Sequence, residues 1–420
     1  MKKVIAFILA AIMIFTLCAC GQQEVIRKKQ PVHYPNDNNP TARPADPPEP
    51  VKTPEPEAEE EAEEEVKIPE LVGDYGVKLV DTLAEDGKNT VVSDMSVNMA
   101  LCMILEGAEG EVKDQLEAYL GIKKEEAKDY NKYIVSLLNE NEMDELKTAI
   151  ANSLWMKEND IDGEYLQTLL DYYQAEVETV DFKDPETANK INQWCNEKTN
   201  ELIPEIVQAD AIKEMSAILV NALYFKANWI DAFGDADENG KFDGKKAPMM
   251  TGGADLYYEN DQATAFGKRY YGGYQFIGIL PKEEGAFTLA DLDLASLLES
   301  ETSEDDVVAT MPKFKTDFEA TFSEYSDQLG LNAMFQPDAD FSGINPDFYV
   351  DEIIHKTVMS IDENGTEAAA VTAIMMKANG MMIEEEPEVK EVVLDRPFAF
   401  VIMDSEGHSL FTGKINTVTE

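Results

Sequence analysis

Residues 363–390 read ENGTEAAAVTAIMMKANGMMIEEEPEVK, a long run of small and apolar residues with acidic residues at both ends. Its alanines favour a helix, but the portion AAAVTAIMM is apolar nearly all round, so such a helix would have to be wholly buried. The DENG turn at residues 362–365 favours exposure instead. The stretch therefore fits an extended strand better than a helix.

As a strand, this stretch separates into one uncharged face and one charged face. Every second residue from Thr366 is uncharged, and the set is Thr366, Ala368, Ala370, Thr372, Ile374 and Met376. The opposite face carries Glu367 and Lys377. A strand with one uncharged face suits a sheet that covers a core. The small residues at its start would let it slide between strands that are already in place.

The chain begins with a secretory signal rather than a membrane-spanning helix. Lys2 and Lys3 precede an apolar run that ends in LCAC at residues 17–20. This ending resembles a bacterial lipobox, which implies that residues 1–19 are a lipoprotein signal peptide and that the thiol of Cys20 is acylated. We expect an extracellular protein anchored to the bacterial cell membrane through its N-terminal lipid. Plain secretion with cleavage nearby is the alternative.

The rest of the chain divides into a stalk and a domain. Residues 20–69 are rich in proline and glutamate and cannot bury enough apolar surface to fold, so they predict a disordered stalk. Residues 70–420 are long for one domain but within the range of a single large one. The net formal charge is -48, most of it in this domain. Such a surface repels nucleic acid, anionic lipid and heparin-like sugars, so we expect no polyanion partner. We also expect a monomer.

Two cysteines lie in the domain, Cys102 and Cys195. Each lies in an apolar pattern with helical spacing, so two separate buried thiols are the simpler prediction. A disulfide between them is the alternative that the sequence leaves open. The fold does not depend on a disulfide framework in either case.

Apolar periodicity predicts an α+β domain with helices dominant in its first half and strands in its second. Helical spacing occurs at residues 71–83, 97–105, 112–120, 165–173 and 187–199. Strand patterns occur at residues 149–155, 175–182, 217–225, 307–314, 348–362, 396–404 and 409–416. The run at 217–225 is continuously apolar, which is typical of a central strand buried on both faces. The last two strands predict a hairpin through residues 405–408.

Catalytic motifs are missing from the sequence. The domain holds two histidines, His355 and His408, and the third, His33, lies in the stalk. There is no HExxH, GxSxG, CxxC or glycine-rich phosphate loop. We therefore expect no enzymatic activity, no metal and no cofactor. His355 occupies an alternating strand position, where a hydrogen-bonded core residue is the simplest interpretation.

Seven segments in order resemble the serpins, the family of suicide protease inhibitors. They are SDMSVNMALCMILEGAEGEVKDQL (93–116), VNALYFKANW (220–229), VATMPKF (308–314), DADFSGI (338–344), DENGTEAAAVTA (362–373), RPFAFVIMD (396–404) and LFTGKI (410–415). The resemblance covers about the whole domain. It implies the serpin fold, in which about eight or nine helices surround three β-sheets and an exposed reactive-centre loop, here at about 363–390.

The resemblance also implies a mechanism. In inhibitory serpins a target serine endopeptidase cuts the loop and forms an acyl-enzyme, and the loop then inserts into the central sheet and displaces the catalytic groups of the protease. The inhibitor needs no catalytic group of its own. The alternative is a non-inhibitory serpin that acts as a binding module or a protease substrate, which a charged or proline-bearing hinge would favour.

Several residues match functional regions of the family. The hinge, where the loop leaves the sheet, comprises Glu363, Gly365, Thr366, Glu367, Ala368, Ala369, Ala370 and Thr372. The shutter, beneath the inserting strand, comprises Ser93, Ser96, Asn221 and His355, and Trp229 matches the breach, the top of the opening sheet. Two residues depart from the family pattern, Asp94 for a proline and Ala227 for a glycine, and we expect them to alter the rate of sheet opening.

The position of the cleaved bond follows from the family's usual hinge length, which, counted from Glu363, places the bond between Asn379 and Gly380. The segment from there to the RPF at residues 396–398 is longer than usual, so the register can shift. Asparagine suits an asparaginyl protease and Lys377 a trypsin-like enzyme. Either of two methionines, Met381 or Met382, suits an elastase-, chymotrypsin- or subtilisin-like enzyme, the group that we favour.

Overall fold

The structure is a computed structural model that describes residues 74–139, 142–157, 161–302, 306–346, 348, 350–366 and 389–418. All of them lie in one compact unit, Glu64–Glu420. The signal peptide with Cys20, the stalk up to residue 69, and residues 367–388 of the loop lie outside the described residues.

Nine α-helices occur among the described residues, most of them in the first half as predicted. They are α2 (Asp74–Leu83), α3 (Asp94–Leu105), α4 (Gly110–Leu120), α5 (Lys124–Asn139), α6 (Gly163–Tyr173), α7 (Pro185–Lys198), α8 (Ala209–Ile212), α9 (Leu294–Glu299) and α10 (Ser326–Leu329). Gly121 ends α4 in the left-handed conformation. The sequence analysis missed α5, whose narrow apolar stripe Tyr130, Ile134 and Leu138 is masked by many charged neighbours.

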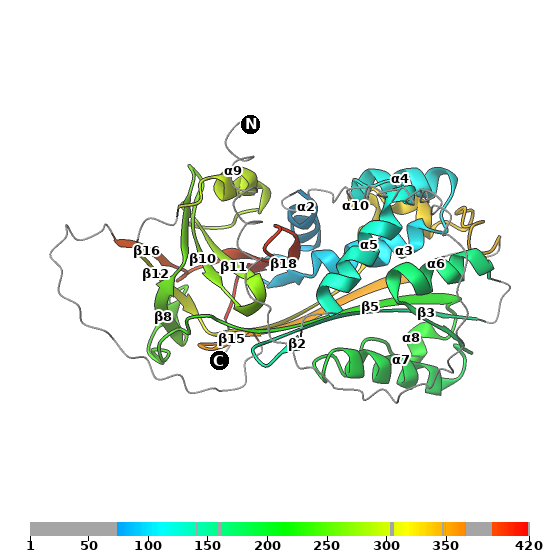
Figure 1. Ribbon diagram of the computed structural model, residues 1–420, viewed down its shortest axis with the longest axis horizontal. Coiled ribbons are helices and arrows are strands. Elements are labelled where there is room, and N and C mark those ends of the chain that lie inside the picture. The colour runs from blue at the N-terminus through cyan, green and yellow to red at the C-terminus, as the bar shows by residue number, and fades with distance from the viewer. Residues whose placement is uncertain are drawn as a thin grey trace, which may run out of the picture. The chain divides into compact units, whose positions relative to one another are not determined.

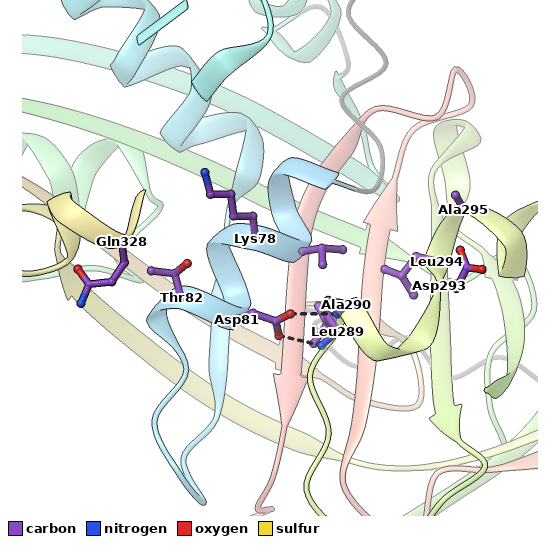
Figure 2. A pocket seen from close by; sticks show the side chains of 10 residues that line it. Lys78, Asp81, Thr82, Leu289, Ala290, Asp293, Leu294, Ala295 and Gln328 are labelled. Carbon is purple, nitrogen blue, oxygen red and sulfur yellow. Dashed lines mark hydrogen bonds between the residues drawn. The ribbon is translucent and has the colours of Figure 1, made fainter. Parts of the chain in front are cut away.

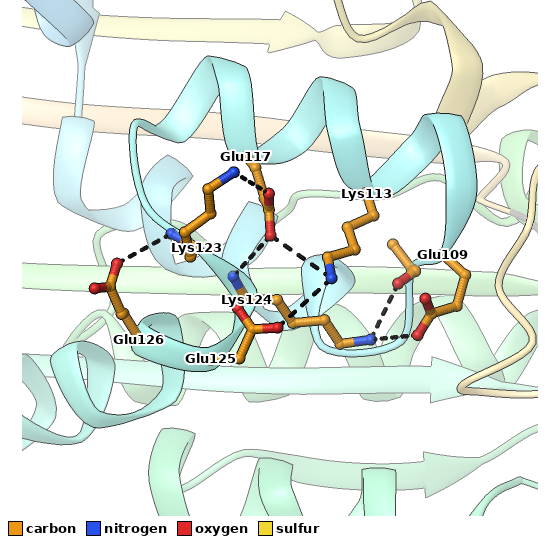
Figure 3. Close-up of polar contacts among 8 residues, drawn as sticks. Glu109, Lys113, Glu117, Lys123, Lys124, Glu125 and Glu126 are labelled. Atoms are coloured by element: carbon orange, nitrogen blue, oxygen red, sulfur yellow. Dashed lines mark hydrogen bonds and ion pairs between the residues drawn. The ribbon is translucent and has the colours of Figure 1, made fainter.

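Charged side chains tie α4 to α5 (Figure 3). Glu117 accepts hydrogen bonds from Lys123 Nζ (2.6 Å) and from the backbone N–H of Lys124 (3.1 Å). Lys124 Nζ reaches Glu109 at 2.9 Å. Burial acts to raise the pKa of Glu117, but these hydrogen bonds outweigh it and hold that pKa below its ordinary value. The network fixes the turn between the two helices.

The described strands form three principal sheets and one two-stranded ribbon. The central sheet has the order β13-β14-β15-β5-β3-β2, with β4 paired to β3, and the second has the order β1-β18-β17-β11-β10-β9. The third sheet is β16-β12-β8, and β6 pairs with β7. The central strands are β2 (Glu142–Met143), β3 (Leu146–Met156), β4 (Glu176–Thr179), β5 (Ala217–Asn228), β13 (Phe314–Thr321), β14 (Glu352–Ile361) and β15 (Gly365–Thr366). The others are β1 (Thr90–Val92), β6 (Lys241–Phe242), β7 (Lys245–Lys246), β8 (Met249–Ala254), β9 (Leu256–Glu259), β10 (Ala263–Arg269), β11 (Gln275–Pro281), β12 (Asp306–Pro312), β16 (Val389–Val393), β17 (Phe398–Met403) and β18 (Ser409–Ile415).

Helices cover both faces of the central sheet (Figure 1). Alternate residues of β5 therefore enter different cores. Leu219 and Phe225 pack into the core shared with α3 and α5, whereas Val220 and Ala222 pack into the core shared with α7. The prediction of a central strand buried on both faces is confirmed.

The two cysteines lie in these two different cores. Cys102 on α3 and Cys195 on α7 are both free and fully buried. Burial raises the pKa of each thiol to about 12. The prediction of two separate thiols is confirmed, and the disulfide alternative is wrong.

The C-terminal hairpin is also confirmed. β17 pairs antiparallel with β18, and in the intervening turn the backbone N–H of His408 donates to Asp404 at 2.9 Å. The sequence analysis missed β8, β9, β10 and β11. β8, β10 and β11 contain glycines (Gly252, Gly267 and Gly278), which interrupt the β-propensity on which the sequence pattern depends, and β9 has only four residues.

Candidate functional site

β14 and β5 are parallel neighbours in the central sheet, yet they pair directly over only a short distance. The paired residues are Glu352 with Ile218 and Ile353 with Leu219. Beyond them, residues 354–360 of β14 face residues 220–226 of β5 without direct pairing in the described part of the chain. We call this unpaired stretch the slot.

At the far end of the slot, β15 lies between the two strands. Thr366 pairs antiparallel with Ile361 of β14 and also with Ala227 of β5. Gly365 pairs with Asn228. The first residues of the hinge are thus already a strand of the central sheet.

Close packing explains the glycine at the start of β15. A Cβ added to Gly365 would lie 2.0 Å from the carbonyl oxygen of Ala227. The preceding turn is held by Asp362, whose carboxylate accepts from the backbone N–H groups of Asn364 (2.7 Å) and Gly365 (3.3 Å). The DENG sequence therefore brings β15 into direct backbone contact with β5.

Trp229 binds the turn from the side of β5. Its indole Nε1 donates to the carbonyl of Asp362 at 3.1 Å, and its backbone N–H donates to the carbonyl of Asn364 at 2.8 Å. The indole stacks on Tyr270 with ring centroids 4.0 Å apart. The Tyr270 hydroxyl in turn lies 2.6 Å from Thr366 Oγ1. The aromatic pair therefore contacts both the turn and the first inserted side chain.

An ion pair fixes the other end of the turn. Lys313, between β12 and β13, lies 3.0 Å from Glu363. Burial acts to raise the pKa of Glu363, but backbone hydrogen bonds and Lys313 outweigh it, and the pKa falls below its ordinary value. Glu363 is therefore ionised at neutral pH and holds the hinge against β13.

The structure brings the four shutter residues together under the slot. The backbone N–H of Ser93 donates to His355 Nε2 of β14 at 3.1 Å. Ser96 Oγ donates to Asn221 Oδ1 of β5. The start of α3 thus contacts both strands that border the slot.

One further residue extends the shutter. Asn152 of β3 lies opposite Asn221 in the sheet register. It accepts a hydrogen bond from the Asn221 amide and donates to the carbonyl of Tyr173 at 2.8 Å. Sequence reasoning missed it because a polar residue in a buried strand stands out only once the strand register is known.

His355 is a hydrogen-bonded core residue. It is 5% exposed, and burial lowers its pKa to about 4. The imidazole is therefore neutral at neutral pH, so its Nε2 can accept the hydrogen bond from Ser93. It acts as an anchor for α3.

Other predicted residues cannot be placed. Those outside the described residues are Cys20, Glu367, Ala368, Ala369, Ala370, Thr372, Lys377, Asn379, Gly380, Met381 and Met382. Of the hinge, Glu363, Gly365 and Thr366 are described.

A separate pocket of about 710 Å³ opens beside α2 (Figure 2). Asp81 closes one side of it by accepting hydrogen bonds from the backbone N–H groups of Leu289 (2.8 Å) and Ala290 (2.9 Å). No slot, shutter or breach residue lines this pocket. In the described part of the chain, no His, Cys, Asp or Glu cluster suits a metal ion. No described helix has the length and apolar character needed to cross a membrane.

The model of the family "Serpin (serine protease inhibitor)" matches residues 70–418. An uncharacterised serpin-like protein of Thermococcus kodakarensis is 31% identical over 365 residues, which cover 82% of this chain and 84% of that protein. The native structure of Tengpin, a thermophilic serpin, matches with a TM-score of 0.72 and 31% identity, covering 82% of this chain and 92% of that one. The latent structure of Tengpin matches with a TM-score of 0.69 and 30% identity, covering 82% and 96%.

Proposed function

Because the chain belongs to the serpin family, we propose that it is an inhibitory serpin, a suicide substrate that traps serine endopeptidases. The observation that supports this most is the position of β15, which already lies between β14 and β5 at the end of the slot. The residues that follow Thr366 are small and uncharged on one face. They are suited to continue the strand along the slot.

Loop insertion is favourable because it pairs a strand on both sides. Each backbone hydrogen bond contributes about 0.5–1.5 kcal/mol net, so a strand with two new neighbours gains on the order of 10 kcal/mol. That free energy can drag an acylated protease from its docking position and displace its catalytic groups. Deacylation then fails because catalysis requires their precise alignment.

The target follows from the loop sequence. We propose an elastase-, chymotrypsin- or subtilisin-like enzyme, cleaving at Met381 or Met382. A trypsin-like enzyme cleaving at Lys377 and an asparaginyl protease cleaving at Asn379–Gly380 are the alternatives. The lipobox at Cys20 and the stalk favour a protein displayed on a bacterial surface, where it would meet secreted proteases.

The test is incubation of the protein with trypsin, chymotrypsin, pancreatic and neutrophil elastases, subtilisin and an asparaginyl protease. We expect a covalent adduct that survives SDS with at least one serine protease, together with a released C-terminal peptide whose mass identifies the cleaved bond. Cleavage by every enzyme without an adduct would contradict the proposal and support the substrate alternative.

Thr366→Arg is the matched control variant. Thr366 is 3% exposed and packs against Tyr270, so an arginine cannot enter the sheet there without burying an unpaired charge. The variant should still be cut at the same bond but should form no adduct. An adduct of undiminished yield would show that trapping does not depend on insertion at this position.

A further inference from the structure

Asp94 is a fully buried acid at the first position of α3. It is 3% exposed. Its Oδ2 accepts hydrogen bonds from two side chains of β18, Ser409 Oγ at 2.5 Å and Thr412 Oγ1 at 2.6 Å. Its Oδ1 has no hydrogen-bond partner among the described residues. The acid therefore ties the start of α3 to β18, while one of its oxygens stays unsatisfied.

The surroundings of Asp94 are close-packed, and the described residues place no charge there that offsets it. A Cβ on Gly76 of α2 would lie 2.4 Å from Asp94 Oδ2. The ionisable groups that face it are the buried hydroxyls of Tyr75 of α2 and Tyr119 of α4, which also face each other. Burial raises the pKa of both tyrosines well above their ordinary value. The groups described around Asp94 are therefore neutral at neutral pH.

Asp94 lies between the two residues that attach α3 to the slot. Ser93 binds β14 through His355, and Ser96 binds β5 through Asn221. β14 and β5 cannot separate for a new strand unless the start of α3 moves or gives up one of these bonds. The hydrogen bonds of Asp94 to β18 also hold the start of α3 in place and therefore resist that movement.

Burial raises the pKa of Asp94 to about 6, although hydrogen bonds from Ser409, Thr412 and its own backbone N–H oppose the rise. The unfolded-state pKa of an aspartate is about 3.9. Because the folded-state pKa is the higher one, the stability that the protonated acid contributes is fully present below about pH 4 and is lost as pH rises through about 6. Above that pH the protein carries a buried charge without a counterion, which is costly.

We propose that Asp94 is a positioning residue that controls opening of the central sheet: protonated, it holds α3 beneath the closed shutter, and ionised, it weakens that hold and speeds loop insertion. The inference rests on the proposed inhibitory function, since loop insertion is the step that it controls. Movement of α3 would let water reach the carboxylate, so the cost of the buried charge is relieved as the sheet opens.

His355 titrates nearby in the opposite sense. Its pKa is lowered to about 4, so its contribution to stability is lost as pH falls below about 6.5. The two effects oppose each other in the wild-type chain. The measurement must therefore compare each variant with wild type at the same pH.

The test compares the full-length chain with Asp94→Asn, whose neutral amide imitates the protonated acid. Samples are incubated at several values between about pH 5 and about pH 8, and the rate of spontaneous loss of inhibition is assayed at one common pH. We expect the ratio of the wild-type rate of loss of inhibition to the Asp94→Asn rate to be about tenfold larger at about pH 7.5 than at about pH 5. A rate ratio that does not change with pH would overturn the proposal.

Glu106→Gln is the matched control. Glu106 lies just past the other end of α3, and burial raises its pKa also. The ratio between the rates at which Glu106→Gln and wild type lose inhibition should not vary with pH. A pH-dependent ratio for Glu106→Gln, combined with a constant ratio for Asp94→Asn, would overturn the proposal. It would show that Glu106, not Asp94, makes the rate depend on pH.

A second variant keeps the proposal testable if Asp94→Asn does not fold. Thr412→Val removes one hydrogen bond that favours the ionised acid. The pH at which the rate of spontaneous loss of inhibition rises should therefore move upward by roughly half a unit to one unit. A downward shift or no shift would contradict the proposal.

A readout without protease separates this inference from the proposed function. The urea midpoint, followed by tryptophan fluorescence, should differ between wild type and Asp94→Asn by an amount that grows with pH. If that difference appears but no protease is trapped, the inhibitory function fails and the role of Asp94 as a proton-dependent anchor stands. If proteases are trapped but the difference is constant, this inference alone fails.

Discussion

At the scale of single residues, the site depends on a few side chains whose environment leaves little freedom. Gly365 has no room for a Cβ, and His355 accepts a hydrogen bond that requires it to be neutral. Asp94 departs from the family's proline and is fully buried. Each of these constraints comes from a neighbour distant in the sequence.

We expect Gly365→Ala to push β15 away from β5, because the added methyl would lie 2.0 Å from the Ala227 carbonyl oxygen. The native state should lose about 1–3 kcal/mol in urea unfolding, and proteases should cut next to residue 365 more readily. Gly163→Ala is the control, since a Cβ there meets nothing within 4 Å. Equal stability of the two variants would contradict the close contact.

His355 should make the protein less stable in acid. Its pKa is lowered to about 4 by burial, against an unfolded value of about 6.5. The unfolded state therefore binds the proton first, and stability is lost as pH falls from about 6.5 towards 4. In the Asp94→Asn variant, where the opposing effect of Asp94 is removed, the urea midpoint should show this loss of stability in full. The loss should vanish when His355→Gln is added. Persistence of the full loss in the double variant would contradict the assignment.

At the scale of elements, the start of β15 is held by an aromatic pair. Trp229 and Tyr270 lie stacked, and between them they bond to the turn and to Thr366. α3 holds the middle of the slot through Ser93 and Ser96. In the proposed mechanism, the sheet would therefore have to open at two separate places, the breach and the shutter.

Tyr270→Phe should loosen β15 while keeping the stacked ring. It removes the hydroxyl that lies 2.6 Å from Thr366 Oγ1, a loss of about 1 kcal/mol. Hydrogen exchange at residues 365 and 366 should become faster. Tyr271→Phe is the matched control, because Tyr271 is 39% exposed. Equal exchange in the two variants would show that the hydroxyl does not hold the hinge.

At the scale of the whole domain, two well-packed strands of the central sheet, β14 and β5, pair directly over only a short distance among the described residues. Cores lie on both faces of the sheet, and the slot interrupts pairing between β14 and β5. A strand inserted there would pair with both neighbours once the start of α3 has moved or given up its bonds to them. Loop insertion, as proposed, would give the domain a second, more fully paired arrangement.

Cleavage of the loop should therefore stabilise the protein. After a single cut near Met381, we expect the thermal midpoint to rise by roughly 20 °C or more, since a gain on the order of 10 kcal/mol shifts the midpoint strongly. Calorimetry of cut and uncut protein provides the measurement. After the same cut, the Thr366→Arg variant should have nearly the thermal midpoint of its uncut form. A decrease in the midpoint of the wild type after cleavage would contradict loop insertion.

The sequence by itself determined the α+β class, the double burial of β5, the C-terminal hairpin and the turn before the hinge, because apolar periodicity and turn residues act over short distances. It missed α5 and β8 to β11, where charged residues or glycines obscure the periodicity. The resemblance named the shutter residues and Trp229, but not their contacts.

Only the tertiary structure decided which distant residues meet. Strand register placed Asn152 opposite Asn221, and the packing of α3 against β18 gave Asp94 its partners Ser409 and Thr412, more than 300 positions away. Local patterns cannot specify such contacts, since they arise when separate elements bury their apolar faces together. For the same reason, the resemblance marks Asp94 as unusual, while the fold makes it a buried acid that joins α3 to β18.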